Sequence, residues 1–126
     1  MILLKERAFF LLGPRQTGKS TLLKTVFPNC HNIDLLEADT FRELSAFPES
    51  MRQRLTPADR LIIIDEIQKL PSLLDEVQLL IDRNRDLRFI LTGSSARRLK
   101  RGSANLLGGR ALFYNLDDMV ALSSRL

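Results

Sequence analysis

The sequence has very few residues that could form covalent or metal cross-links. Its 126 residues include one cysteine, Cys30, and one histidine, His31, which are neighbours. A single cysteine excludes an internal disulfide, and two adjacent ligands do not make a zinc site. We interpret the pair as ordinary residues at the start of a strand, and we expect a cytoplasmic protein.

Long hydrophobic runs are also absent. The longest cover residues 8–12 and 61–64, far short of the roughly 20 residues that span a bilayer. The N-terminus reaches a charge at Lys5 and has no signal-peptide core, so we expect no membrane association. The net charge is +4 and the isoelectric point near 9.7, which suits a polyanion such as a nucleotide without requiring nucleic acid.

Short apolar stretches alternate with segments of helical spacing along the chain. This alternation predicts an α/β domain in which a mostly parallel sheet is covered by helices on both faces. Ligands bind such sheets at the carboxyl ends of the strands. Expected strands cover residues 8–12, 32–36, 61–64, 88–91 and 111–116. Expected helices cover residues 20–27, 38–44, 49–55, 95–100 and a segment starting near Pro71, with Leu73, Leu74, Val77, Leu80 and Ile81 on one face.

A polar, glycine-bounded loop follows the first expected strand. It has the spacing G-x-x-x-x-G-K-[ST] of a phosphate-binding loop. Glycine lets backbone N–H groups approach phosphate closely, and the helix that follows adds the positive end of its dipole. Lys19 is placed to reach the β- and γ-phosphates, and Ser20 to ligate Mg²⁺. The expected nucleotide contacts are Gly13, Pro14, Arg15, Gln16, Thr17, Gly18, Lys19, Ser20 and Thr21. A glycine turn before an N-capped helix is the less favoured alternative.

Two carboxylates end the expected strand over residues 61–64. We expect Asp65 to face the Mg²⁺ through a water, and Glu66 to orient or deprotonate the water that attacks the γ-phosphate. A glutamate directly after the aspartate favours water over a substrate hydroxyl, and therefore hydrolysis over phosphotransfer. The alternative is a solvated turn, since acidic residues are common after strands. A GTPase is less favoured because the sequence has no N-K-x-D stretch.

Hydroxyl side chains follow the next expected strand. Thr92, Ser94 or Ser95 is placed to bond the attacking water or the γ-phosphate, but Ser94 or Ser95 would equally cap the following helix. Both interpretations stay open.

Basic residues gather after these hydroxyls, at Arg97, Arg98, Lys100 and Arg101. A solvated helix face is the ordinary explanation. A nucleic-acid surface is less favoured, because no aromatic residues are interleaved and the net charge is modest. Arg110 follows two glycines, and we expect it to stabilise charge on the γ-phosphate in the site of a neighbouring protomer.

Three stretches, in order and spacing, resemble a prokaryotic AAA-type P-loop ATPase family whose members usually carry a C-terminal domain of unknown function. They are "LLGPRQTGKSTLLK", "LIIIDEIQKLPSLLDEVQLLID" and "FILTGSSARRLKRGSANLLGGRA". The resemblance covers residues 8–116. It implies a three-layer αβα fold of the additional-strand type, with a parallel five-stranded sheet in the order 5-1-4-3-2. It also implies Mg-ATP as ligand, Lys19 and Ser20 as Walker A, Asp65 and Glu66 as Walker B, Thr92 or Ser94 as sensor, and Arg110 as a finger candidate.

Compared with that family, the chain is short at both ends. We therefore expect one ATPase core domain over residues 1–126 without a lid or C-terminal domain, either a fragment or a minimal core. Apolar residues near the C-terminus are expected to face a missing domain or a second copy in a homo-oligomer. They are Leu106, Leu107, Met119, Val120 and Leu122. Three hypotheses remain: an Mg²⁺-dependent ATPase, a nucleotide-binding switch with negligible hydrolysis of its own, and a nucleic-acid-stimulated ATPase.

Overall fold

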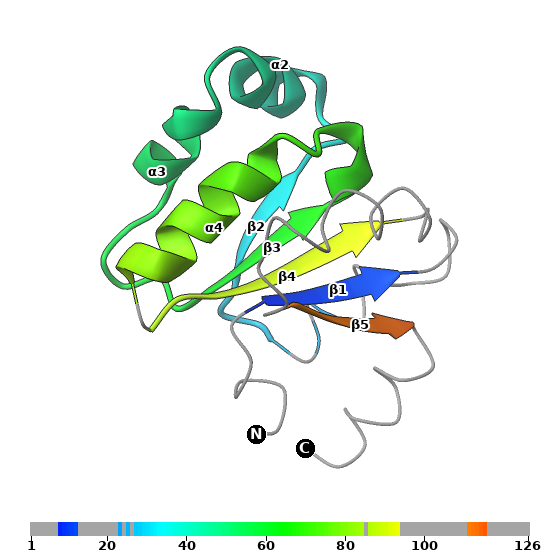
Figure 1. The fold of residues 1–126 in the computed structure, drawn as a ribbon, viewed down its shortest axis with the longest axis vertical. Coiled ribbons are helices and arrows are strands. Elements are labelled where there is room, and N and C mark those ends of the chain that lie inside the picture. The colour runs from blue at the N-terminus through cyan, green and yellow to red at the C-terminus, as the bar shows by residue number, and fades with distance from the viewer. Residues whose placement is uncertain are drawn as a thin grey trace.

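The fold is built on a parallel sheet of five strands in the order β2-β3-β4-β1-β5 (Figure 1). The computed structural model describes residues 8–12, 23, 25, 27–84 and 86–93, together with the backbone of 111–115. The strands are β1 (Ala8–Leu12), β2 (His31–Asp34), β3 (Leu61–Asp65), β4 (Arg88–Gly93) and β5 (Ala111–Asn115). Counted from the other edge this order is 5-1-4-3-2, so the predicted topology is confirmed.

Apolar side chains lie on both faces of the sheet, as the uninterrupted apolar runs predict. In β1, Ala8 and Phe10 belong to one core cluster, whereas Phe9 and Leu11 belong to another. Because successive strand residues point to opposite faces, the two clusters are the two sides of the sheet. The second cluster also contains Leu23, which follows the glycine-bounded loop of residues 13–18 in the sequence. The three-layer prediction is therefore confirmed.

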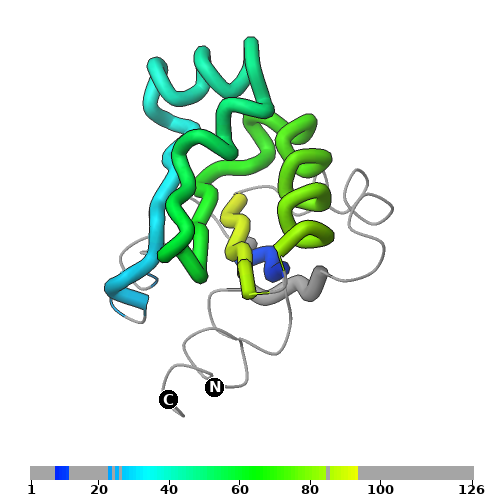
Figure 2. Tube along the Cα trace, turned by 90° about the vertical axis from the view of Figure 1, so that its left-hand side faces the viewer, coloured from blue at the N-terminus to red at the C-terminus, as the bar shows by residue number. Residues whose placement is uncertain are grey.

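Three described helices cover the first cluster. They are α2 (Ala38–Ala46), α3 (Met51–Arg54) and α4 (Leu73–Arg83), and the side view shows α4 standing on one side of the strands (Figure 2). Four of the five residues expected on the buried face of α4 are fully buried, and Leu80 packs against them while partly exposed.

Arg52 of α3 donates two hydrogen bonds to Glu76 of α4, at 3.0 and 2.9 Å. This hydrogen bonding raises the pKa of the Arg52 guanidinium above its ordinary value.

The second strand is shorter than the sequence predicts. It ends at Asp34 and not at residue 36, because Asp34 Oδ1 accepts a hydrogen bond of 2.9 Å from the backbone N–H of Leu36 and turns the chain. Residues 49–55 are also not one helix, since Pro48–Ser50 form a 3₁₀ turn, η2, before α3 begins. Both β3 and β4 run further than expected, to Asp65 and Gly93.

The expected helix over residues 95–100 lies outside the described residues, as does most of the one over 20–27. In the part of the chain that is described, no helix has the length and apolar character needed to cross a bilayer.

Candidate functional site

The strand ends that were expected to carry ligand-binding groups lie at one edge of the sheet. All the strands are parallel, so their carboxyl ends meet there (Figure 1). Thr92 of β4 is in register with Leu11 of β1, and Leu91 is in register with Ile64, the residue before Asp65. Asp65, Thr92 and Leu11 thus form one row across three strands. With neighbouring strands about 4.8 Å apart, Asp65 lies about 10 Å from β1, the strand that the predicted phosphate-binding loop follows in the sequence.

A threonine hydroxyl ties the two carboxylate-bearing residues to the neighbouring strand. Thr92 Oγ1 donates to Asp65 Oδ1 at 3.0 Å and accepts from the backbone N–H of Glu66 at 3.1 Å. Asp65 and Glu66 are each 6% exposed, and Thr92 is 1% exposed. Burying a carboxylate is costly unless it is hydrogen-bonded, and Thr92 supplies part of what Asp65 needs. The hydroxyl therefore fixes the end of β3 against β4.

Glu66 has an unusual backbone conformation. Its φ of 61° and ψ of 49° lie in the left-handed region, and no other non-glycine residue among those described has a positive φ. Such a conformation costs on the order of 1–3 kcal/mol and is found most often at functional sites. It ends the strand abruptly and starts a 3₁₀ turn, η3 (Ile67–Lys69), which is closed by a bond from Lys69 N to Glu66 O. The Glu66 side chain thereby stays at the buried strand end.

A glutamine in this turn contacts the Glu66 carboxylate. Gln68 is buried, and its Nε2 donates a hydrogen bond to Glu66 Oε2. The sequence analysis did not single out this residue. The sequence offers one indication of its burial: Gln68 is a polar residue in a short segment that begins with Ile67 and ends with Leu70, and both of these apolar residues are buried.

The structure brings together three of the predicted site residues, Asp65, Glu66 and Thr92. The other predicted site residues lie outside the described residues, namely Gly13 to Thr21, Ser94 and Arg110, as do Ser95, the basic run and the C-terminal apolar residues. His31 begins β2, as expected, with its Nδ1 3.3 Å from Asp59 Oδ2. No group of three or more His, Cys, Asp or Glu suited to a metal ion occurs within the described ranges.

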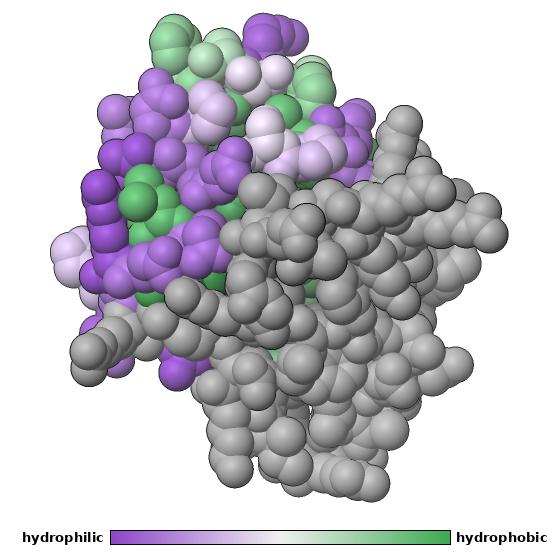
Figure 3. Space-filling model, in the orientation of Figure 1, coloured by the Kyte–Doolittle hydropathy of each residue, from purple (hydrophilic) through white to green (hydrophobic). Residues whose placement is uncertain are grey.

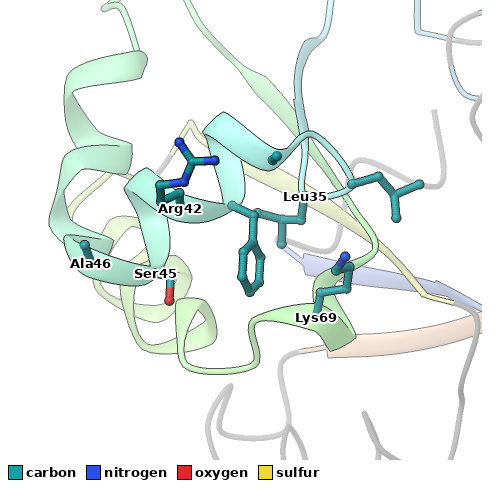
Figure 4. A pocket seen from close by; sticks show the side chains of 8 residues that line it. Leu35, Arg42, Ser45, Ala46 and Lys69 are labelled. Carbon is teal, nitrogen blue, oxygen red and sulfur yellow. The ribbon is translucent and has the colours of Figure 1, made fainter.

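A groove of about 570 Å³ lies elsewhere, between α2 and η3 (Figure 4). Its two charged lining residues, Arg42 and Lys69, are cations, and the Lys69 Nζ lies 5.3 Å from the centre of the Phe41 ring. Phe41 packs against the first core cluster, whereas Asp65 alternates with Ile62 and Ile64 of that cluster and so faces the other side of the sheet. The groove therefore does not belong to the Asp65–Thr92 row. The surface over these helices mixes hydrophilic and apolar residues (Figure 3).

Thr92 should contribute measurably to stability. Replacing Thr92 by valine keeps its shape and removes both hydrogen bonds, leaving the buried Glu66 N–H and Asp65 Oδ1 without that partner. We expect the free energy of unfolding, measured by urea denaturation, to fall by about 2–3 kcal/mol. The matched control is Thr40→Val in α2, where the buried hydroxyl donates one 3.3 Å bond to Glu37, and there we expect a loss under about 1 kcal/mol. Equal losses in both variants would contradict a special role for Thr92.

The chain is similar in sequence and in fold to known proteins. A family model described as an AAA domain matches residues 5–121 of the chain. Two uncharacterized proteins, from Mycobacterium bovis and Mycobacterium tuberculosis, are each 31% identical to it over 114 residues, which is 87% of this chain and 25% of theirs. The chain thus spans a quarter of the length of these curated relatives. The structure of C. elegans PCH-2 matches 90% of this chain and 35% of its own, with a TM-score of 0.56 and 16% identity, and shares the fold.

Proposed function

The chain belongs to the AAA domain family of nucleotide-binding, ATPase-like domains, and on this premise we propose that it binds Mg-ATP and hydrolyses it to ADP and phosphate. One observation supports hydrolysis most: Asp65 and Glu66 are buried at the carboxyl edge of the sheet, where Thr92 bonds the Asp65 carboxylate and the Glu66 backbone N–H. A glutamate fixed at this edge is suited to activate water.

The proposed phosphate-binding loop follows β1, the strand next to the one that carries Thr92. β1 lies beside β4, and Gly13 follows β1 directly in the sequence, which supports a phosphate-binding loop close to Thr92. In the proposal, backbone N–H groups of residues 13–18 surround the phosphates, and Lys19 binds the β- and γ-phosphate oxygens. In this arrangement the triphosphate lies between the loop and the carboxylates of Asp65, the last residue of β3, and Glu66, the residue after it.

The residues present fit a magnesium ion. Mg²⁺ prefers oxygen ligands, and it is commonly bound by one or two protein side chains together with phosphates and water. Ser20 and Asp65 would supply those oxygens, the latter through a water, so no cluster of three acidic residues is needed. When bound, the ion neutralises charge on the phosphates.

The residues at the sheet edge have distinct proposed roles. Glu66 accepts a proton from the water whose oxygen attacks the γ-phosphorus, while the bond from that phosphorus to the bridging oxygen breaks and ADP leaves. Thr92 donates its one O–H to Asp65 and accepts from the Glu66 N–H, so it holds the end of β3 in place, and its second lone pair can accept a hydrogen bond from the attacking water. Thr92 and Ser94 therefore both stay candidates for the sensor position. Arg110 remains the candidate for stabilising its charge in a neighbouring copy's site.

The proposal is tested by two measurements on the purified chain. Calorimetric titration should show binding of Mg-ATPγS, and phosphate release from ATP should require Mg²⁺ and stop on addition of EDTA. Binding without phosphate release would overturn hydrolysis and favour the nucleotide-switch hypothesis. Absence of binding by the folded chain would overturn the proposed site as a whole.

A further inference from the structure

The buried Gln68 amide contacts the carboxylate of Glu66, the proposed base for hydrolysis. Gln68 is 8% exposed, although glutamine is a residue of protein surfaces. Gln68 lies in the turn η3, and its amide donates to the carboxylate of Glu66, the residue that follows β3. Burial of an amide is unfavourable unless its hydrogen bonds are made, so this position is not explained by packing alone.

The local backbone makes this contact possible. The left-handed conformation of Glu66 ends the extended backbone, and η3 is closed by bonds from Lys69 N to Glu66 O and from Leu70 N to Ile67 O. On a regular strand, residues two apart lie on the same face about 6.6 Å apart, whereas in η3 the Gln68 amide contacts the Glu66 carboxylate directly. The strained residue and the glutamine therefore form one structural unit.

We propose that Gln68 is a positioning residue for hydrolysis: its amide fixes the Glu66 carboxylate in the orientation that accepts the proton of the attacking water. This inference rests on the proposed function and deepens it. A glutamate side chain has three rotatable bonds, and each orientation that does not face the water lowers the fraction of productive complexes. A neutral amide orients the carboxylate and leaves its negative charge uncompensated. A lysine or arginine at this position would orient it too, but would also neutralise that charge.

The test compares the same substitution at two glutamines. Gln68→Met keeps the length of the side chain and removes the donor. The control is Gln78→Met in α4, where the Gln78 Nε2 donates to Asp82 Oδ2 at 3.0 Å, in another glutamine–carboxylate pair. We expect Gln68→Met to lower kcat about 10- to 100-fold, with the Kd for Mg-ATPγS within about twofold of the parent value. Gln78→Met should leave both values unchanged.

A second comparison separates positioning from a general structural role. If Gln68 acts through Glu66, adding Gln68→Met to a Glu66→Gln chain should cause no further loss of single-turnover rate, because the base is already absent. A merely structural role would lower the rate again in the double variant and would weaken nucleotide binding as well.

The outcomes distinguish this inference from the function on which it rests. A parent chain that releases no phosphate overturns the proposed hydrolysis, and the role of Gln68 with it. A parent that hydrolyses ATP, with Gln68→Met equally active or faster, overturns the positioning role alone. Parallel losses of kcat, nucleotide affinity and melting temperature in Gln68→Met also overturn it, because they indicate a structural defect.

Discussion

Replacing Glu66 by glutamine is expected to lower the rate of ATP hydrolysis by about 10²- to 10⁴-fold while nucleotide binding is retained. Glutamine has the same length as glutamate and keeps hydrogen-bonding groups beside Gln68, but it does not accept a proton from water at neutral pH. The backbone of residue 66 meets the same left-handed requirement in both proteins, so the change is confined to the chemistry of the side chain. The rate is measured as phosphate release, and binding as the Kd for Mg-ATPγS.

The matched control is Glu43→Gln. The Glu43 carboxylate accepts a 2.8 Å bond from Arg54 on the exposed surface of α2, away from the sheet edge. We expect its kcat to equal that of the parent. Equal turnover in the Glu66→Gln chain and the parent would contradict the assignment of Glu66 as the base and would mean that another residue activates the water.

The second large effect is expected at the phosphate-binding loop. Lys19→Ala removes the charge that is proposed to bind the β- and γ-phosphate oxygens. Hydrogen bonds to charged groups contribute about 1.5–3 kcal/mol each, so the loss of two raises the Kd for Mg-ATPγS at least about 100-fold. Calorimetric titration should therefore detect no binding at nucleotide concentrations that saturate the parent.

Lys69→Ala provides the control for loss of one positive charge. Lys69 is exposed in η3 and contacts the Phe41 ring on the groove side, so its removal should change the Kd by less than about twofold. Two variants with equally weakened binding would show that general electrostatic attraction, rather than a specific lysine, drives nucleotide binding. An unchanged Kd in Lys19→Ala would rule out the proposed loop.

Much of the fold follows from the apolar pattern of the sequence. Uninterrupted runs such as Leu61–Ile64 indicate strands buried on both faces, and the helical spacing after Pro71 indicates α4. The order of the strands was implied only by the resemblance to a family, because periodicity carries no information about which strands are neighbours. The end of β2 was missed because the Asp34 side chain competes with the sheet for the backbone N–H of Leu36.

The candidate site was only partly predictable, because the fold class indicates which strand ends meet but not the local backbone conformation at those ends. Asp65, Glu66 and Thr92 follow apolar runs, and parallel strands bring their ends together, so their proximity follows from the fold class. The left-handed backbone of Glu66 has no signal in the sequence, since glycine or asparagine is the usual residue there. The role of Gln68 depends on that backbone, so no spacing rule indicated it.

The position of β1 in the sheet has a consequence during protein synthesis. Both neighbours of β1 are made much later, β4 from residues 88–93 and β5 from residues 111–115. At about 5–20 residues per second, the ribosome needs on the order of 4–16 s after completing β1 to complete β4. Throughout that time the segment Ala-Phe-Phe-Leu-Leu has no strand partner and carries no charge. A nascent chain of this protein therefore presents an aggregation-prone segment, which a chaperone that binds short apolar stretches would protect.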